Sequence, residues 1–237
     1  MDELKYDVSF IIPVLDSHEI IRRLLLWYTK FIPSTWEMII VDDGSPKPIV
    51  PSCSHGINLR IIYTKDGRPW TQGCARNMGA LYAKGKYLLM TDVDHFFTKE
   101  CFDFASEFKG DLLFFDRTYG VINEDSQLVL DQEEFIRYGL PQKVNPKVKL
   151  GYHCSSYLMK KSIFYDLLGG YDKKFCGRYG KEDSDLIIRY RDLVSKGLVE
   201  KHSKCPHTSY VFPNPNGDKL QLFHHLRWPK GIKYGWK

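Results

Sequence analysis

The chain has 237 residues, of which 43% are hydrophobic and 27% charged, enough for one large globular domain with a sizeable core. Its apolar runs fall far short of the roughly 18 residues that a membrane span needs, and residues 1–5 do not resemble a signal peptide. The composition argues against a transmembrane segment, and we expect a cytoplasmic protein. The net charge of +5 is mild and suits an anionic substrate as well as a nucleic acid.

Six cysteines are scattered along the chain, at positions 53, 74, 101, 154, 176 and 205. They form no Cys-x-x-Cys pair and show no zinc-type spacing. We therefore expect neither a disulfide framework nor a structural zinc site, and we take all six as reduced.

The first hundred residues alternate between predicted strands and helices. Short β-branched and aromatic runs predict strands, and apolar residues at helical spacing predict helices. The expected strands are 8–13, 38–41, 59–63 and 86–90, and the expected helices are 18–31 and 72–83. This alternation predicts an α/β fold, a mostly parallel central sheet flanked by helices, with ligands beyond the carboxyl ends of the strands.

The second half is less regular. It predicts strands at 111–115 and 157–159, helices at 132–138, 161–168 and 183–194, and a proline-broken loop at 141–149. The last residues, 219–237, mix basic and aromatic side chains. The chain shows no internal repeat and no low-complexity tract, which favours a single domain.

Acidic pairs follow two of the predicted strands. Asp92 and Asp94 come after the strand 86–90, and in an extended loop both carboxylates would point the same way, toward one divalent cation. Mg²⁺ and Mn²⁺ prefer such oxygen ligands and are usually completed by substrate phosphates. A solvated loop, or a helix cap at Thr98, is the structural alternative. Asp42 and Asp43 can accept from a pyrimidine N–H or a ribose hydroxyl, or simply form an Asx turn.

Two further segments carry candidate residues. Arg76 and Asn77 lie in the helix that follows Gly73, from where they could reach a diphosphate; a surface arginine is the alternative. Asp183 lies at a helix N-terminus, where the helix dipole would hold it ionised, as a general base requires. An ordinary acidic helix start is the alternative there.

The ordered motifs resemble family 2 glycosyltransferases of the GT-A fold. The resemblance covers about residues 8 to 195, and the segment Glu182-Asp183 is also similar to galactosyltransferase-type relatives. The motifs are Val8-Ser9-Phe10-Ile11-Ile12-Pro13, Val41-Asp42-Asp43-Gly44-Ser45, Ala75-Arg76-Asn77-Met78-Gly79, Thr91-Asp92-Val93-Asp94, Gly169-Gly170-Tyr171-Asp172 and Gly180-Lys181-Glu182-Asp183.

The resemblance implies a metal-dependent, inverting transferase that moves a sugar from a nucleotide-diphosphate sugar, expected to be a UDP-sugar, to an acceptor hydroxyl. It implies a set of site residues. Pro13 and Leu15 would line the nucleotide base, Asp43 would bind uracil and Asp42 would support that turn. Asp92 would contact the ribose or sugar, and Asp94 with Asp92 would hold Mn²⁺ or Mg²⁺. Asp183 would be the general base, and Glu182 would contact the acceptor or donor sugar. Family members often carry a Tyr-Asn pair where this chain has Leu15-Asp16, which puts base stacking at Leu15 in doubt.

Histidines complete the expected site. In several GT-A enzymes a histidine from a late loop completes the metal shell, which makes His224 or His225 a candidate, with His224 preferred; packing or solvent exposure is the alternative. We expect His95 to be structural and His153 to contact the acceptor. The resemblance divides the single domain, residues 1–237, into a nucleotide-sugar half (1–100), an acceptor and catalytic half (101–210) and a basic aromatic tail (211–237).

Two other functions and several acceptors stay open at this point. A nucleotidyltransferase would be expected to show a Gly-rich basic loop soon after the first strand, where this chain has Asp16-Ser17-His18-Glu19. A non-catalytic sugar-nucleotide or acceptor-binding module is disfavoured by the full set of acidic positions. A glycan, protein or small-molecule acceptor is favoured, and a modified nucleic-acid base is the alternative.

Overall fold

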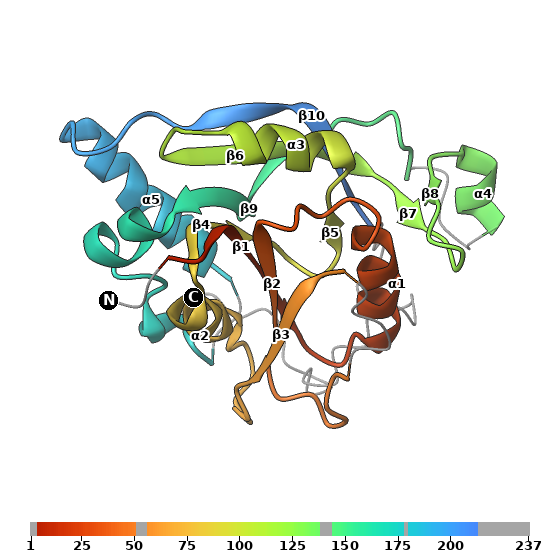
Figure 1. The fold of residues 1–237 in the computed structure, drawn as a ribbon, viewed down its shortest axis with the longest axis horizontal. Coiled ribbons are helices and arrows are strands. Elements are labelled where there is room, and N and C mark those ends of the chain that lie inside the picture. Colours follow the sequence, from red (N-terminus) through yellow and green to blue (C-terminus); the bar gives the residue numbers. More distant parts are fainter. Residues whose placement is uncertain (1–3, 51–55, 138–143, 178–179, 213–237) are drawn as a thin grey trace, which may run out of the picture.

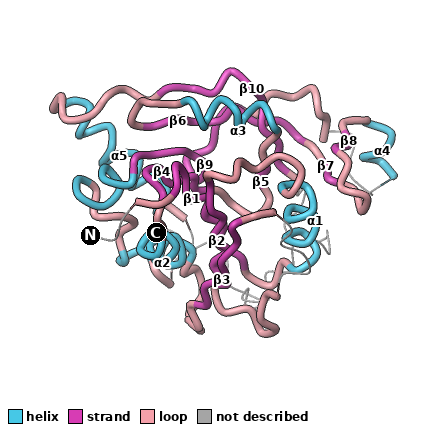
Figure 2. The backbone as a smooth tube through the Cα atoms, in the orientation of Figure 1, coloured by secondary structure: helices cyan, strands magenta, loops and turns pink. Residues whose placement is uncertain are grey.

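A curled sheet of eight strands forms the centre of the molecule (Figure 1). The computed structural model describes residues 4–50, 56–137, 144–177 and 180–212. The strands lie in the order β3-β2-β1-β4-β9-β6-β10-β5, and β7 and β8 form a separate small sheet (Figure 2). Their bounds are Tyr6–Val14 (β1), Trp36–Asp42 (β2), Asn58–Tyr63 (β3), Gly85–Met90 (β4), His95–Phe96 (β5), Leu112–Tyr119 (β6), Val121–Ile122 (β7), Leu128–Val129 (β8), Gly151–Lys160 (β9) and Ser203–Val211 (β10).

The strand directions divide the sheet in two. Strands β3, β2, β1 and β4 are all parallel, as predicted for the first half. Strand β9 is antiparallel to both of its neighbours, β4 and β6, while β10 is parallel to β6 and β5 is antiparallel to β10. The predicted α/β fold is confirmed, with a mixed rather than parallel second half.

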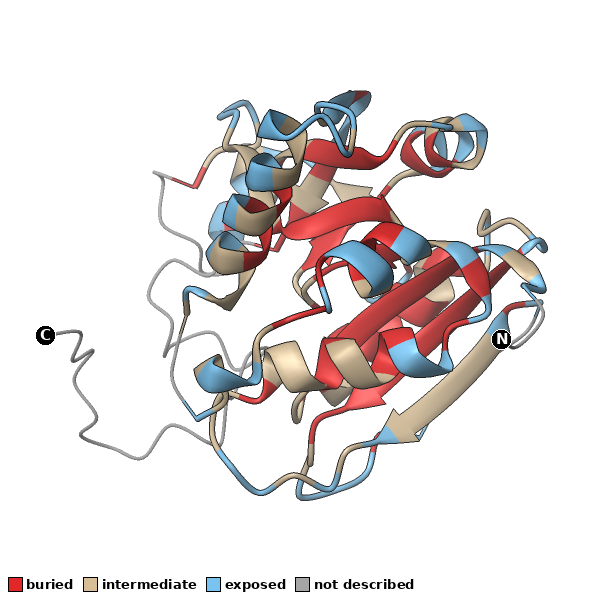
Figure 3. Cartoon of the chain, turned by 90° about the vertical axis from the view of Figure 1, so that its left-hand side faces the viewer, coloured by how far each residue is buried: buried red, intermediate tan, exposed pale blue. Residues whose placement is uncertain are grey.

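Helices cover both faces of the sheet. Helices α1 (His18–Tyr28) and α3 (Lys99–Glu107) pack on one face, and α2 (Gln72–Tyr82), α5 (Glu182–Ser195) and the π-helix η1 (Ile163–Leu167) pack on the other. Alternate residues of β1 serve the two faces, because Phe10 joins the α1 side and Ile11 the α2 side. The central strands are therefore buried on both sides (Figure 3). The remaining helices are the short α4 (Gln132–Arg137) and the 3₁₀ turn η2 (Lys173–Phe175).

Close packing of α2 on the sheet depends on a glycine. A Cβ at Gly79 would lie 2.6 Å from Ile11 Cγ2 and 2.9 Å from Val41 Cγ2. Glycine therefore lets the helix approach β1 and β2 closely enough to bring its first turns against their carboxyl ends.

The expected elements are confirmed, but the strand expected at 157–159 is the much longer β9, and the one expected at 111–115 extends to Tyr119. The short strands β7 and β8 were not expected, and neither were α3, β5 and β10. These three lie next to the acidic loop after β4, since β5 follows it directly and Phe212 N donates to Asp94 O at 2.8 Å. No helix within the described ranges is long and apolar enough to cross a bilayer.

The expectation that all cysteines are reduced is wrong for two of them. Cys74 of α2 and Cys176, just after η2, form a disulfide that spans 102 residues of sequence. Cys101, Cys154 and Cys205 are free thiols, and Cys53 lies outside the described residues. The bond joins the first turn of α2 to the segment that leads into α5. The cytoplasmic location stays a prediction, and the disulfide argues against it, because cytosolic proteins keep their thiols reduced.

Peptide mapping tests this disulfide. A non-reducing digest of the purified chain is expected to contain one linked pair of peptides carrying Cys74 and Cys176, which separates after reduction. The peptide carrying Cys101 is the internal control, since it should run as a free thiol in both digests. Alkylation of both Cys74 and Cys176 without prior reduction would contradict the assignment.

Candidate active site

The loops after β1 and β2 are hydrogen-bonded to each other at the carboxyl edge of the sheet. Asp43 N donates to Val14 O at 2.8 Å, and Asp16 N donates to Ser45 Oγ at 2.9 Å. The carboxylate of Asp42 accepts from the backbone N–H of Ser45 and of Ile49, each at 2.8 Å. Asp42 thus supports the turn, as predicted, and presents its neighbour Asp43.

Asp43 has two hydroxyl partners that the sequence did not indicate. Its carboxylate is buried and accepts from Thr64 Oγ1 at 3.1 Å and Thr71 Oγ1 at 2.7 Å. Pro13 lies in β1 opposite Val41, and Leu15 is half-buried beyond the strand end. These residues share the edge of the sheet where the nucleotide was expected.

Arg76 is buried at the centre of the site and joins two carboxylates. One guanidinium nitrogen donates to Asp183 Oδ1 and the other to Asp92 Oδ1, each at 2.5 Å, and the side chain is 0% exposed. The guanidinium also lies 5.4 Å from the centre of the Tyr171 ring. Burial alone would lower the pKa of Arg76, but the two carboxylates raise it well above its usual range, so the side chain stays charged.

Asp92 has a donor for each of its oxygens. Oδ1 accepts from Arg76 and from Gln72 Nε2 at 2.5 Å, and Oδ2 accepts from Ser155 Oγ at 2.6 Å. Burial would raise the pKa of Asp92, but Arg76 and the Ser155 hydroxyl hold it below its ordinary value. Asp92 is therefore ionised and fixed in place.

Asp94 has fewer side-chain hydrogen-bond donors than Asp92 among the described residues. The expected extended loop is wrong, because Val93 and Asp94 form a turn closed by His95 N donating to Asp92 O at 3.1 Å. Within the described ranges, no other residue's side chain donates to the Asp94 carboxylate. Burial and the neighbouring Asp92 charge raise the pKa of Asp94 to about 7. A nearby positive charge would favour the ionised form of this carboxylate.

Asp183 and Glu182 begin α5, as predicted. Asp183 Oδ1 accepts from Arg76 and from Tyr171 Oη at 3.0 Å. Burial outweighs Arg76 and raises the pKa of Asp183, whereas the sequence suggested that the helix dipole would hold it ionised. Burial and the Asp183 charge also raise the pKa of Glu182, whose buried Oε2 has no hydrogen-bond partner among the described residues.

The side chain of Asn77 binds the backbone of Tyr171, whereas the sequence placed it toward a diphosphate. Its Nδ2 donates to Tyr171 O and its Oδ1 accepts from Tyr171 N, both at 2.8 Å. A Cβ at Gly170 would lie 2.6 Å from Asn77 Oδ1, and Gly170 has φ +73°, so only glycine suits this turn. Asn77 thus fixes Tyr171, and through it Asp183.

The histidines separate into three cases. His95 is buried, with Nδ1 2.6 Å from Ser156 Oγ and Nε2 2.6 Å from Ser209 Oγ, which confirms the structural assignment. Burial lowers the pKa of His95 to about 3. His153 Nδ1 lies 2.6 Å from Ser155 Oγ, which in turn donates to Asp92. His224 and His225 lie outside the described residues.

The structure thus assembles residues that lie far apart in the sequence. Asp92, Asp183, Glu182 and Arg76 meet at one edge of the sheet, with Asp94 beside them. Tyr171, which the Gly169-Gly170-Tyr171-Asp172 motif marked, binds Asp183. No motif marked Gln72 and Ser155, which bind Asp92, or Arg117, whose charge acts on Asp94. Their only sequence signal was proximity to predicted strand and helix ends.

Comparison with known proteins identifies the family. Residues 9–203 match the family described as glycosyltransferase-like family 2, and the chain belongs to this family. It is 30% identical over 131 residues to an uncharacterized glycosyltransferase of Rickettsia felis, a match that covers 52% of this chain and 21% of that protein. An uncharacterized glycosyltransferase of Haemophilus influenzae is 34% identical over 95 residues, covering 39% of this chain and 31% of that protein.

Solved structures show the same GT-A fold. S. aureus TarS 1-349 in complex with UDP-GlcNAc superposes with a TM-score of 0.61 at 20% identity, covering 89% of this chain and 59% of that chain. The mannosyltransferase PcManGT from Pyrobaculum calidifontis, in complex with GDP-Man and Mn²⁺, gives a TM-score of 0.55 at 13% identity, covering 91% and 60%. The matched part of this chain thus covers 59% and 60% of these two solved chains, and 21% and 31% of the two curated relatives.

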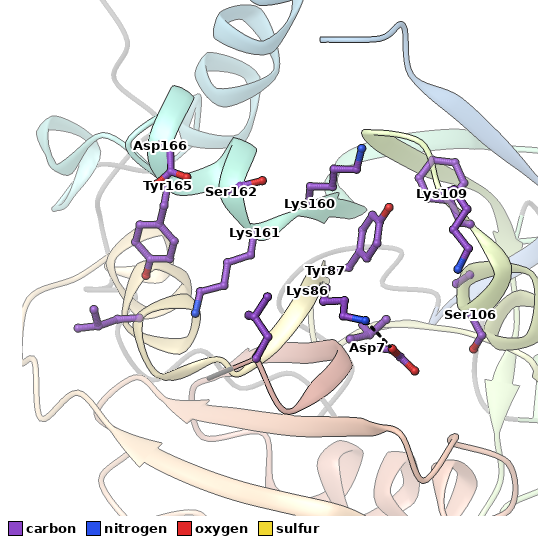
Figure 4. A pocket seen from close by; sticks show the side chains of 15 residues that line it. Asp7, Lys86, Tyr87, Ser106, Lys109, Lys160, Lys161, Ser162, Tyr165 and Asp166 are labelled. Atoms are coloured by element: carbon purple, nitrogen blue, oxygen red, sulfur yellow. Dashed lines mark ion pairs between the residues drawn. The ribbon is translucent and has the colours of Figure 1, made fainter. Parts of the chain in front are cut away.

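A cavity of about 830 Å³ lies at the opposite end of the strands (Figure 4). Its lining includes Val8 near the start of β1, Tyr87 near the start of β4 and Lys160 at the end of β9. The acidic pair Asp92 and Asp94 follows the carboxyl end of β4, the end away from Tyr87, so this cavity is separate from the candidate active site.

Proposed function

We propose that the chain is a metal-dependent, inverting glycosyltransferase that transfers a sugar from a UDP-sugar to an acceptor hydroxyl. The observation that carries this proposal is the joining of Asp92 to Asp183 through the buried Arg76. This link brings a strand-end carboxylate, suited to the donor, next to a helix N-terminal carboxylate, suited to the acceptor. The family match and the nucleotide-sugar complexes of the structural neighbours support it.

The donor base would lie at the ends of β1 and β2. Pro13 and Leu15 would line it, and the Asp43 carboxylate, held by two threonine hydroxyls, would accept from the uracil N–H. Residues 1–100 would thus form the nucleotide-sugar half and residues 101–210 the acceptor half. Asn77 would act on the site only through Tyr171.

The residues present fit a divalent cation that the donor helps to bind. No group of three or more His, Cys, Asp or Glu side chains in the described part of the chain would hold a metal alone. One or two carboxylates completed by diphosphate oxygens are typical of Mg²⁺ and Mn²⁺ sites. Asp94 would be the ligand, Asp92 would border the site and contact the sugar, and His224 would supply a nitrogen. A cation bound there would offset charge on the leaving diphosphate.

Asp183 would act as the general base. Its raised pKa suits proton transfer from an acceptor hydroxyl, because the ionised Asp183 carboxylate is a stronger base than that of an ordinary aspartate. Tyr171 and Arg76 orient the carboxylate. Glu182 would contact a sugar hydroxyl through its unpartnered Oε2, because a buried carboxylate oxygen favours a donor. Direct attack by the hydroxyl would invert the anomeric carbon.

Asp94→Asn tests the donor and metal assignment. We expect Mn²⁺-dependent UDP binding to weaken about 10-fold or more, since the variant loses the open carboxylate. Titration calorimetry of UDP with and without Mn²⁺ would measure this. Asp103→Asn, on the exposed face of α3, is the matched control and should bind as the wild type. Unchanged Mn²⁺-dependent binding by Asp94→Asn would remove Asp94 from the metal site.

A further inference from the structure

Arg117 lies next to the acidic cluster and takes no part in the chemistry described above. It belongs to β6 and is in register with Gly151 of β9 and with Ser209 of β10. Gly151 has no side chain, which leaves room beside the arginine. The Arg117 charge acts on Asp94, His95 and His153, so its guanidinium lies near these residues at the carboxyl edge of the sheet.

The Arg117 side chain lacks part of its hydrogen bonding. Its Nε is buried and has no hydrogen-bond partner among the described residues. The nearly buried Arg23, by contrast, pairs through its Nε with Glu19 at 2.8 Å. The Arg117 side chain as a whole is half-buried, and only its Nε is fully enclosed. A buried N–H without an acceptor is costly, because it has lost water without gaining a partner. Such a group favours an anionic ligand.

The position of Arg117 separates it from the nucleotide strands. In the order β1-β4-β9-β6, strand β6 lies two places beyond β4, on the side away from β1 and β2. On β9, His153 is two residues from Gly151, and its Nδ1 reaches Asp92 through Ser155 Oγ. His153 and Arg117 therefore border the acidic cluster on its far side from Asp43.

We propose that Arg117 forms an anion-binding subsite for a phosphate group of the substrates, adjoining Asp94. This inference rests on the proposed function. Planar guanidinium groups bind phosphate oxygens through two parallel N–H bonds, which would satisfy Nε and one terminal nitrogen together. The phosphate comes either from the donor diphosphate or from a phosphorylated acceptor, and two titrations distinguish these sources.

Arg117→Gln is the test variant and Lys204→Gln the matched control. Lys204 is a cation on the neighbouring strand β10 that pairs with Asp116. In the first titration, UDP is added to each protein with Mg²⁺ present. About 10-fold weaker UDP binding by Arg117→Gln than by the control assigns the phosphate to the donor.

In the second titration, methyl phosphate is added to each protein saturated with UDP and Mg²⁺, at constant ionic strength. Binding by the wild type and the control that is lost in Arg117→Gln assigns the subsite to an acceptor phosphate. Arg117→Lys should retain part of the wild-type binding in either titration. It keeps the positive charge but cannot form two parallel N–H bonds to one phosphate. Unchanged binding by Arg117→Gln in both titrations overturns the proposal.

Thermal unfolding distinguishes an anion-binding Arg117 from a purely structural one. Arg117→Gln is expected to unfold at the same Tm as the wild type or higher, since it removes a buried N–H that has no acceptor among the described residues. A lower Tm with unchanged binding identifies a structural role and overturns the subsite. If the wild type binds no UDP with metal, the proposed function fails, and methyl phosphate titrated into the free protein still decides the role of Arg117.

Discussion

Asp183→Asn is expected to lower the rate of sugar transfer by about 10²- to 10⁴-fold while leaving UDP-sugar binding close to that of the wild type. The amide oxygen can still accept from Tyr171 and Arg76, so the local structure is kept, but it cannot take the proton of the acceptor hydroxyl. Single-turnover transfer with saturating donor measures the chemical step, and calorimetry measures donor binding.

The control lies in the same helical turn. Asp185 pairs with Arg189 at 2.8 Å and with Lys174 at 3.5 Å, outside the Arg76 cluster. Asp185→Asn should therefore transfer at nearly the wild-type rate. Equal losses in the two variants, or undiminished transfer by Asp183→Asn, would contradict the assignment of the base.

The pH dependence of sugar transfer also tests the assignment of Asp183 as the general base. Burial raises the pKa of Asp183, so the base becomes protonated, and transfer falls, as pH decreases through a value above that of an ordinary aspartate. The residual activity of Asp183→Asn should lack this acidic limb.

Arg76→Met is expected to destabilise the fold by about 3–5 kcal/mol at neutral pH, the usual cost of removing one partner from a buried ion pair. Both Asp92 and Asp183 would lose the cation that lowers their pKa values. Equilibrium unfolding in urea measures this loss. Arg137→Met is the matched control, because Arg137 pairs with Glu134 on the surface and is 71% exposed, where about 0–1 kcal/mol is usual.

The loss should depend on pH. The pKa of Asp92 is depressed in the folded protein, so its pairing stabilises the fold above the unfolded pKa, and this contribution is lost as pH falls through the folded pKa. Arg76→Met should therefore differ least from the wild type in acid, where the unpaired carboxylates can protonate. Equal stability of Arg76→Met and Arg137→Met at neutral pH would contradict the central place of Arg76.

The sequence predicted the first half of the fold well because local signals are strong there. The runs that became β1 and β2 are buried and rich in β-branched residues, and β4 contains the buried apolar run Leu88-Leu89-Met90. Helices follow β1 and β3 in alternation. Strand β10 was missed because only Cys205, Ser209 and Val211 of its nine residues are buried, which leaves no apolar alternation to detect. The polar ends of β2 and β4 lie at the edge of the sheet where the candidate site is found.

The partners within the site could not be predicted in the same way. Arg76 meets Asp92 across 16 residues and Asp183 across 107, and the disulfide closes 102 residues. Such contacts follow from the packing of α2 and α5 on the sheet. The spacing of residues along the sequence does not predict that packing. The sequence therefore placed Arg76 toward a diphosphate, whereas folding turned it inward between two carboxylates.

The most direct test is to incubate the wild-type chain with UDP-GlcNAc, other UDP-sugars and GDP-Man, with Mn²⁺ or with EDTA, and to measure the released nucleoside diphosphate. The proposed function predicts slow, metal-dependent release of UDP from a UDP-sugar, abolished by EDTA and by Asp94→Asn. Absence of both binding and release with every nucleotide sugar in the presence of Mn²⁺ would contradict it.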